Sequence, residues 1–248
     1  MRPLLPMLLL LAAAAPARAD EALIDYGRQL VDATYAFIGP EVADPAMRFA
    51  GNNLACQNCH LDGGRTSHGL SLAGVSAKYP KPLPGGGSET LAERVNGCMT
   101  RSMNGRPLPE AGREMRGFLA YLAMLTRDAG SFGDPAEDPE PLPAAATAPD
   151  PARGRELYLA ACAACHRADG TGMRNGQPGE PLGYLHPPLW GPDSFNAAAG
   201  MSRLVTAAAF IHDDMPLGTN AGAPALSAQD AWDIAAFIDA QPRPPAPR

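Results

Sequence analysis

Two C-x-x-C-H motifs constrain this chain more than any other feature of its sequence. Their residues are Cys56, Cys59 and His60 in the first motif and Cys162, Cys165 and His166 in the second. Two thiols at this spacing can form thioether bonds to the vinyl groups of one haem, and the adjacent histidine can bind the iron as proximal ligand. The motifs therefore predict two covalently bound haem c groups. Redox dithiols or zinc sites are the alternative, but zinc requires more Cys or His at ligand spacing than the chain has.

The same order of elements surrounds both motifs. The segment Gly27-Arg28-Gln29-Leu30 resembles Gly154-Arg155-Glu156-Leu157, and each predicts a helix before its motif. Apolar residues at three- and four-residue spacing predict closing helices over 115–125 and 228–240. Neither half has a convincing run of alternating residues that would predict a strand. We therefore expect a mainly α fold of two tandem class I cytochrome c domains.

Composition divides the chain further. Residues 127–151 are rich in Pro, Ala, Asp and Glu and lack hydrophobic periodicity, so they predict an extended linker. The first domain is then expected over 20–126 and the second over 152–242. The proline-rich tail over 243–248 is expected to fray.

The N-terminal residues predict export. A basic start, an apolar run from Leu4 to Ala15 and the sequence Ala17-Arg18-Ala19 are typical of a signal peptide over 1–19, which implies a periplasmic protein. An uncleaved anchor is the alternative, but a membrane span requires about 20 apolar residues, and we expect no span in the mature chain. The net charge of −6 becomes −8 without Arg2 and Arg18. Nucleic acid is therefore not an expected partner, because phosphate binding requires a clustered basic surface.

The second haem has one favoured distal ligand. Met215 lies between His166 and the closing helix and is followed by a proline, the usual distal arrangement in small cytochromes c. Its rivals are Met201, Met173 and His212. Lysine is excluded in this half, because the only lysines in the chain lie at 78 and 81. Methionine ligation raises the reduction potential.

The fifth cysteine, Cys98, raises the question of the first haem's distal ligand. A buried, unreactive side chain is the common role of a free cysteine, but an exposed thiol is a liability in an oxidising compartment, and thiolates bind ferric iron well. Met103 is the conventional rival, and Met99 and His68 are further candidates. Thiolate ligation would lower the potential of haem 1, so electrons would run downhill to haem 2.

Two segments resemble the thiosulfate dehydrogenases, periplasmic dihaem enzymes related to the SoxA cytochromes of sulfur oxidation. Residues 53–64 read NLACQNCHLDGG, and residues 91–109 read LAERVNGCMTRSMNGRPLP. The resemblance covers nearly all of the mature chain, and its most specific part is the C-x-x-x-S-M-N-G block. It implies that Cys98 ligates haem 1 and that the active site lies beside this haem, between the two domains.

The activity implied by the resemblance joins two thiosulfate ions into tetrathionate at haem 1. The electrons would leave through haem 2 to a soluble cytochrome c or a terminal oxidase. Because the substrates are dianions and the chain is acidic, a local cationic pocket is required. The residues expected to form it are Arg94, Arg101, Arg65 and Ser102, of which Arg94 and Ser102 match family positions credited with substrate binding. Alternatively, these arginines pair with haem propionates or acidic side chains.

The chain departs from the family pattern in one segment. Residues 81–89 read KPLPGGGSE and contain no arginine, although family members often carry additional arginine here. This departure favours the alternative functions, which are a dihaem electron-transfer subunit without its own substrate and a relative that acts on a different small sulfur anion.

Overall fold

Each half of the chain is built on a helix crossing that requires a glycine. In the computed structural model, Gly27 on helix α1 (Ala14–Asp32) crosses helix α4 (Arg113–Arg127), and a Cβ there would lie 1.9 Å from the carbonyl oxygen of Gly117. Gly154 on helix α5 (Pro151–Ala161) crosses helix α8 (Ala228–Asp239), where a Cβ would lie 1.9 Å from the Asp233 carbonyl oxygen. The repeated glycine of the two similar helical openings therefore lets the backbones approach.

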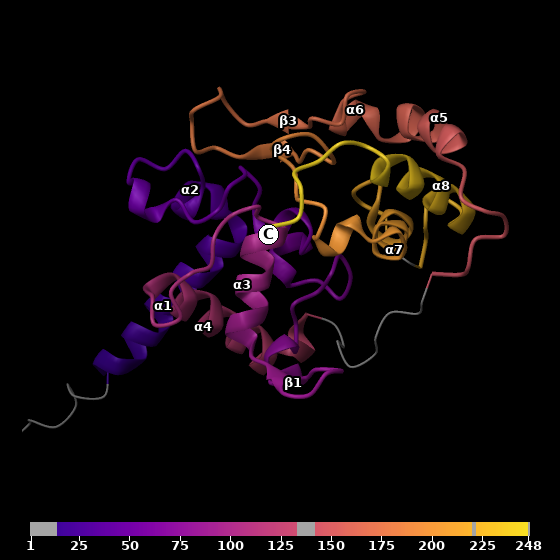
Figure 1. Ribbon diagram of the computed structural model, residues 1–248. Coiled ribbons are helices and arrows are strands. Elements are labelled where there is room, and N and C mark those ends of the chain that lie inside the picture. Colours follow the sequence, from indigo (N-terminus) through magenta and orange to yellow (C-terminus); the bar gives the residue numbers. More distant parts are fainter. Residues whose placement is uncertain (1–13, 133–141, 220–221, 248) are drawn as a thin grey trace, which may run out of the picture.

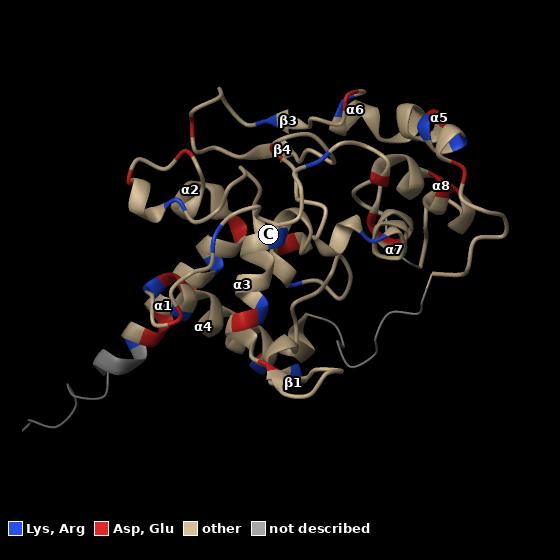
Figure 2. Ribbon diagram, in the orientation of Figure 1, with Lys and Arg blue, Asp and Glu red and all other residues tan. Residues whose placement is uncertain are grey.

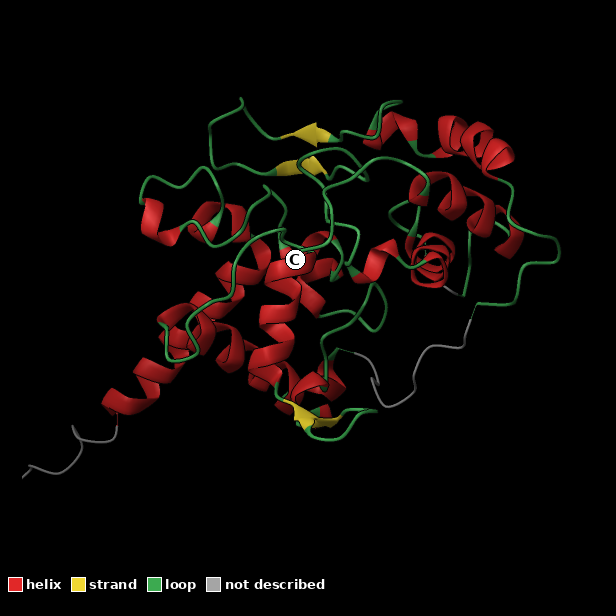
Figure 3. Ribbon diagram, viewed as in Figure 1, coloured by secondary structure: helices red, strands yellow, loops and turns green. Residues whose placement is uncertain are grey.

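The structure describes residues 14–132, 142–219 and 222–247. The fold is mainly α-helical, with two short antiparallel strand pairs and long loops (Figure 3). The remaining helices are α2 (Thr34–Ile38), α3 (Leu91–Arg101), α6 (Ala163–His166) and α7 (Leu204–Asp214). The strands are β1 (Lys81–Pro82), β2 (Ser88–Glu89), β3 (Met173–Arg174) and β4 (Tyr184–His186). The 3₁₀ turns are η1 (Pro45–Met47), η2 (Cys56–Asn58), η3 (Leu61–Gly64), η4 (Val75–Lys78), η5 (Ala129–Ser131) and η6 (Gly200–Ser202).

The helical predictions agree with this architecture. The two helical openings lie in α1 and α5, and the closing helices predicted over 115–125 and 228–240 correspond to α4 and α8. The first C-x-x-C-H motif begins in the turn η2, whereas the second ends with the short helix α6. The expected mainly α fold is confirmed, since each half is built on helices and has one short pair of strands.

Each half has its own apolar core. In the first half, Leu30 of α1 packs with Met115 and Tyr121 of α4, and all three are fully buried. In the second, Tyr158 of α5 packs with Ile234 of α8, and its ring lies 5.1 Å from that of Trp190. Burial of these side chains stabilises the helix pairs by roughly 25 cal/mol per Å² of apolar surface.

Buried amide side chains join the two halves. Asn52 is fully buried, and its Nδ2 donates to the carbonyl oxygens of Ser102 at 2.9 Å and Ser194 at 3.2 Å. Asn196 is 1% exposed, and its Nδ2 donates to the carbonyl oxygen of Thr100 at 2.9 Å. Because buried polar groups are costly when unpaired, these bonds specify one arrangement of the halves.

An arm of the second half reaches over the first. The β3–β4 arm extends toward α2 in Figure 1. On this arm Arg174 forms an ion pair with Glu41 at 2.6 Å, and the amide of Gly179 donates to the same carboxylate at 3.1 Å. The interface thus has a second set of contacts beside these amides, since Asn53 Nδ2 also donates to Glu41 at 3.4 Å and Arg174 also pairs with Asp193 at 3.5 Å.

The linker and the tail are more ordered in their described parts than the composition implies. Residues 133–141 of the linker lie outside the described residues, but Trp232 Nε1 donates to the Pro143 carbonyl at 2.9 Å, which attaches the rest to α8. In the tail, the Pro244 carbonyl accepts from the Ala197 amide at 3.0 Å, and the Arg243 guanidinium lies 4.6 Å from the Phe195 ring centre. These two contacts involve residues 243 and 244, the first of the tail whose composition predicts fraying.

The N-terminal prediction falls mostly outside the described residues, which begin at Ala14. In the part of the chain that the structure describes, no helix is both long and apolar enough to span a bilayer.

Candidate haem cavities and anion site

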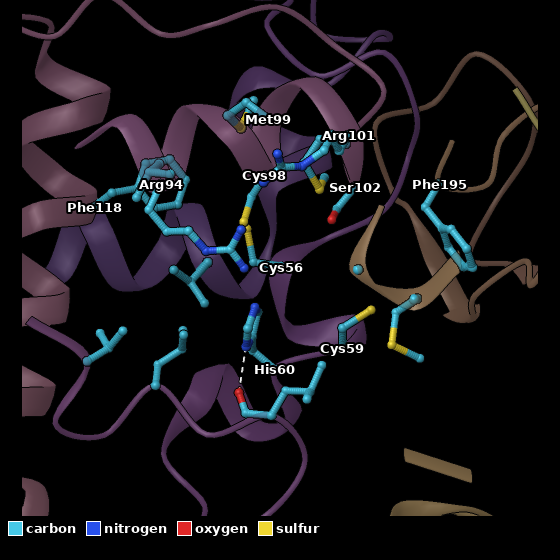
Figure 4. Close-up of a pocket in the computed structure, with 18 of the residues that line it drawn as sticks. Cys56, Cys59, His60, Arg94, Cys98, Met99, Arg101, Ser102, Phe118 and Phe195 are labelled. Carbon is cyan, nitrogen blue, oxygen red and sulfur yellow. Dashed lines mark hydrogen bonds between the residues drawn. The ribbon is translucent and has the colours of Figure 1, made fainter. Parts of the chain in front are cut away.

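A cavity of about 370 Å³ lies between α3, the first C-x-x-C-H segment and the second half of the chain. We call it cavity 1. Its volume falls in the range of small-molecule and cofactor sites. Cys56, Cys59 and His60 lie on one side of it and Cys98 on the other, and Figure 4 shows the Cys98 sulfur directed toward the His60 side.

The position of α3 explains why Cys98 faces this cavity. The helix begins at a capping box, in which Thr90 Oγ1 accepts from the Glu93 amide at 3.1 Å and Glu93 Oε2 accepts from the Thr90 amide at 2.7 Å. Residues at 94, 98 and 101 then share one helix face. This places Arg94, Cys98 and Arg101 on the cavity, and the neighbouring Met99, which is 1% exposed, lines it as well.

His60 is prepared for iron by its hydrogen bond. Its Nδ1 donates to the Leu70 carbonyl oxygen at 2.5 Å, which leaves Nε2 unprotonated. Burial lowers the pKa of His60, so the ring is neutral at pH 7. A neutral imidazole oriented by a second hydrogen bond is the usual form of a metal-binding histidine.

The two thiols of the first motif suit thioether attachment better than redox or zinc chemistry. Burial raises the pKa of Cys56 to about 11 and that of Cys59 to about 12. Redox dithiols react as thiolates and have lowered pKa values. The described residues also contain no group of three His, Cys, Asp or Glu side chains placed to hold a metal ion.

The candidates for the distal position of haem 1 are now placed. Cys98 is half-buried and faces the cavity, and Met99 and Met103 line it as well but belong to the apolar core of the first half. His68 does not line cavity 1, and its Nδ1 is hydrogen-bonded to Asp214 at 2.7 Å. Cys98 remains our candidate, because its sulfur is directed toward the His60 side of the cavity (Figure 4).

The charge around cavity 1 is of one sign. Among the residues that the structure describes, its lining includes Arg94, Arg101 and Arg203 and no Asp or Glu. Burial raises the pKa of the neighbouring Tyr79, and the charge of Arg94 opposes this rise. Elsewhere Lys and Arg alternate with Asp and Glu over both halves (Figure 2). A chain of net charge −6 thus has a cavity suited to anions.

One expected arginine lies outside cavity 1, and one that was not expected lines it. Arg65 does not line cavity 1, because it pairs with Asp62 at 2.8 Å and donates to the hydroxyl of Tyr121 at 3.1 Å. Arg203, which the sequence analysis did not consider, does line it. No local motif marks Arg203, since it stands alone before α7 and reaches the cavity only through the packing of the two halves.

A second cavity, of about 670 Å³, surrounds the second motif, and we call it cavity 2. Cys162, Cys165 and His166 line it together with Met215. The Nδ1 of His166 donates to the Pro187 carbonyl oxygen at 2.8 Å, and burial lowers its pKa, as for His60. Asp62 and Asp214 line this cavity, and no Lys or Arg of the described segments does.

Two of the three rivals of Met215 lie outside cavity 2, whereas Met201 lines it together with Met215. Met173 is 38% exposed and His212 is bound to Asp213 at 2.6 Å, and neither lines cavity 2. His186, which the sequence analysis missed, does line it, with its ring 6.3 Å from that of His166. His186 immediately precedes Pro187, whose carbonyl oxygen accepts the hydrogen bond from His166 Nδ1. Met215 therefore remains our candidate for the distal iron ligand.

The two cavities adjoin. Leu54, Cys59, Phe195 and Met201 line both of them. Helix α7 connects their walls, since Arg203 and Thr206 border cavity 1 and Met215, just beyond its last residue, borders cavity 2. Electron transfer between groups held in the two cavities would therefore cross only a thin layer of side chains.

Comparisons with known proteins agree with this architecture. Residues 48–130 match the family model of the SoxA/TsdA cytochrome c domain, and residues 151–241 match that of cytochrome c. The chain is 37% identical to a thiosulfate dehydrogenase of Stutzerimonas stutzeri over 94% of this chain and 71% of that protein. It is 40% identical to one of Allochromatium vinosum, over 79% of this chain and 72% of the relative.

A solved structure is similar as well. The thiosulfate dehydrogenase TsdBA of Marichromatium purpuratum superposes with a TM-score of 0.75 at 32% identity, over 97% of this chain. The chain spans about half (53%) of that protein's length. Two cytochrome c domains, each with a C-x-x-C-H motif in a cavity, carry two covalently bound haem c groups. The chain belongs to the thiosulfate dehydrogenase family.

Proposed function

We propose that this protein is a periplasmic thiosulfate dehydrogenase whose substrate binds in cavity 1. The observation that carries the proposal is the contrast between the cavities. Within the described part of the chain, cavity 1 is lined by three arginines and no carboxylate, whereas cavity 2 is lined by two aspartates and no Lys or Arg. Small dianions therefore favour the first cavity.

The reaction joins the terminal sulfur atoms of two thiosulfate ions in a new S–S bond. Two electrons leave, no proton is taken up or released, and the product is one tetrathionate ion. The two haem groups supply the oxidising equivalents, since each accepts one electron.

The arginines of α3 allow two negatively charged thiosulfate ions to bind side by side. Two dianions repel each other, and the guanidinium groups of Arg94 and Arg101 offset this repulsion by binding sulfonate oxygens. The hydroxyl of Ser102, at the end of α3, donates a further hydrogen bond. A cavity partly closed to water strengthens these interactions.

Cys98 gives the two haem sites different chemistry. We assign His60 and Cys98 as the iron ligands of haem 1, and His166 and Met215 as those of haem 2. A thiolate ligand lowers a haem potential and a methionine ligand raises it, so electrons pass from the substrate site toward cavity 2. From there they leave to a soluble cytochrome c or a terminal oxidase.

An electron-transfer subunit without its own substrate is the second candidate, and the arginine-free segment 81–89 favoured it. That segment forms the β1–β2 hairpin, and none of its residues lines cavity 1. Its lack of arginine therefore leaves the charge of the cavity unchanged, and the enzymatic function is the better supported.

The test is turnover by the purified holoprotein with ferricyanide as electron acceptor. We expect two ferricyanide ions to be reduced for each tetrathionate formed and each pair of thiosulfate ions consumed. Sulfite, sulfate and buffer alone serve as controls. The absence of turnover between pH 4 and 8 would reject the proposal, and turnover with another sulfur anion alone would identify a different substrate. Export is tested separately by fractionating cells that express the full chain.

A further inference from the structure

The second half of the chain forms one wall of cavity 1. Its contribution comes from a single segment, and the residues are Phe195, Gly200, Met201, Arg203 and Thr206. Arg203 is the charged member of this set. Its backbone forms the N-terminal cap of α7, and its side chain stands at the rim, where it is exposed.

Among the described residues, the Arg203 side chain forms no ion pair or hydrogen bond. Its backbone amide donates to Gly200 O at 3.2 Å, and its carbonyl oxygen accepts from the amides of Thr206 at 2.9 Å and Ala207 at 3.0 Å. By contrast, Arg65 pairs with Asp62 and Arg174 pairs with Glu41. An unpaired guanidinium beside an acid-free cavity is available for an anion.

The segment that carries Arg203 is fixed to the end of α3. The Asn196 amide donates to the Arg101 carbonyl oxygen at 3.2 Å, and its side chain donates to that of Thr100 at 2.9 Å. Ser202 Oγ then donates to the Asn196 carbonyl oxygen at 2.9 Å, one residue before Arg203. The wall is therefore anchored to the helix end that carries Arg101 and precedes Ser102.

We propose that Arg203 is a substrate-binding residue that the second domain contributes to the site in the first. It binds a sulfonate group of one thiosulfate, on the wall opposite Arg94. Two thiosulfate ions carry four negative charges, and Arg94, Arg101 and Arg203 together offset three of them. This inference rests on the proposed thiosulfate oxidation. The competing role for Arg203 is an ion pair with a haem propionate.

The experiment compares three variants of the holoprotein with wild type. Arg203→Gln removes the charge, Arg203→Lys retains it without the planar fork, and Arg155→Gln removes an exposed charge on α5 that lines neither cavity. The measurements are KM and kcat for thiosulfate, the ferric absorption change on titration with thiosulfate, and the potentials of both haems.

We expect Arg203→Gln to raise KM and the titrated Kd about tenfold, the usual loss for one charged hydrogen bond to an anion. The value for Arg203→Lys should fall between those of wild type and Arg203→Gln, while Arg155→Gln and both haem potentials stay unchanged. The inference is overturned if KM stays within twofold of wild type, if Arg155→Gln raises it equally, or if a haem potential shifts at unchanged KM. Inactivity of the wild type would instead reject the proposed function itself.

Discussion

Replacing Asn196 by aspartate tests whether the buried amide joins the two domains as described. The substitution preserves shape and keeps the acceptor Oδ1, which takes a hydrogen bond from the Ala198 amide at 3.0 Å. It replaces the Nδ2 donor, which bonds to Thr100 O at 2.9 Å and Asn104 Oδ1 at 3.3 Å, with an oxygen. The new carboxylate oxygen then faces two other acceptors, the Thr100 carbonyl oxygen and Asn104 Oδ1, in a site that is 1% exposed.

The expected magnitude follows from these contacts. A buried polar group left unpaired costs about 1–3 kcal/mol, so the loss of both bonds should lower the free energy of unfolding by roughly 3 kcal/mol. At about 2–4 °C per kcal/mol for a chain of this size, Tm should fall by about 6–12 °C at pH 7. Calorimetry of the holoprotein measures it.

The loss should depend on pH in one direction. Burial among oxygen acceptors raises the pKa of the introduced carboxyl in the folded state, so the folded protein holds its proton at higher pH than the unfolded chain does. Stability is therefore regained as the pH falls from 7 to 5, because the protonated carboxyl can donate to Thr100 O. An equal loss at both pH values would contradict this reasoning.

Arg174→Gln is the matched control, because it breaks the pair with Glu41 at the same interface but away from α3. We expect it to lower Tm by about 2–4 °C, as for a loss of about 1 kcal/mol, and to leave the KM for thiosulfate unchanged. Asn196→Asp should raise KM, since it loosens the end of α3 that carries Arg101. A Tm for Asn196→Asp within 2 °C of wild type would refute the structural role of this amide.

Three further predictions concern other parts of the fold. Met215→Gly should change the absorption and lower the potential of haem 2 while the spectrum of haem 1 stays as in wild type, and redox titration measures both. Gly154→Ala should lower Tm by about 6–12 °C. The new Cβ would lie 1.9 Å from the Asp233 carbonyl oxygen, so the helices must separate at a cost of about 3 kcal/mol. Gly130→Ala is the control and should leave Tm unchanged, because a Cβ at Gly130 has nothing within 4 Å. Asp233→Asn should destabilise the protein more at pH 7 than at pH 3. Burial raises the pKa of Asp233, but hydrogen bonds from the Asp150 amide and Arg153 outweigh it, so the pKa is lowered in the folded protein. The stabilising effect of the Asp233 carboxylate is therefore lost as the pH falls through this pKa.

Local sequence patterns predicted the parts of the fold that depend on local chemistry. The C-x-x-C-H spacing predicts which cysteines attach a haem, and the period of the apolar residues predicts α4 and α8. The position of Cys98 on a face with Arg94 and Arg101 also follows from helical spacing. These features require no knowledge of how distant segments pack.

Features set by long-range packing could not be predicted in this way. Arg65 was expected at the substrate site, but its pairing with Asp62 and Tyr121 depends on the fold of the first domain. Arg203 reaches cavity 1 only because Asn196 seats the second domain on α3. The order of the tail likewise depends on its contact with Phe195 and Ala197.

The most direct test of the central claim, that thiosulfate is oxidised in the cavity formed by His60 and Cys98, is tetrathionate formation by Cys98→Ala holoprotein that retains both covalent haems. We predict that its turnover falls by at least about 100-fold, in the range seen when a group that acts in the transition state is removed, and that its ferric spectrum changes at haem 1 alone. Turnover and spectrum equal to those of wild type would show that Cys98 is neither at the iron nor at the substrate, and would contradict the assignment of cavity 1 as the active site.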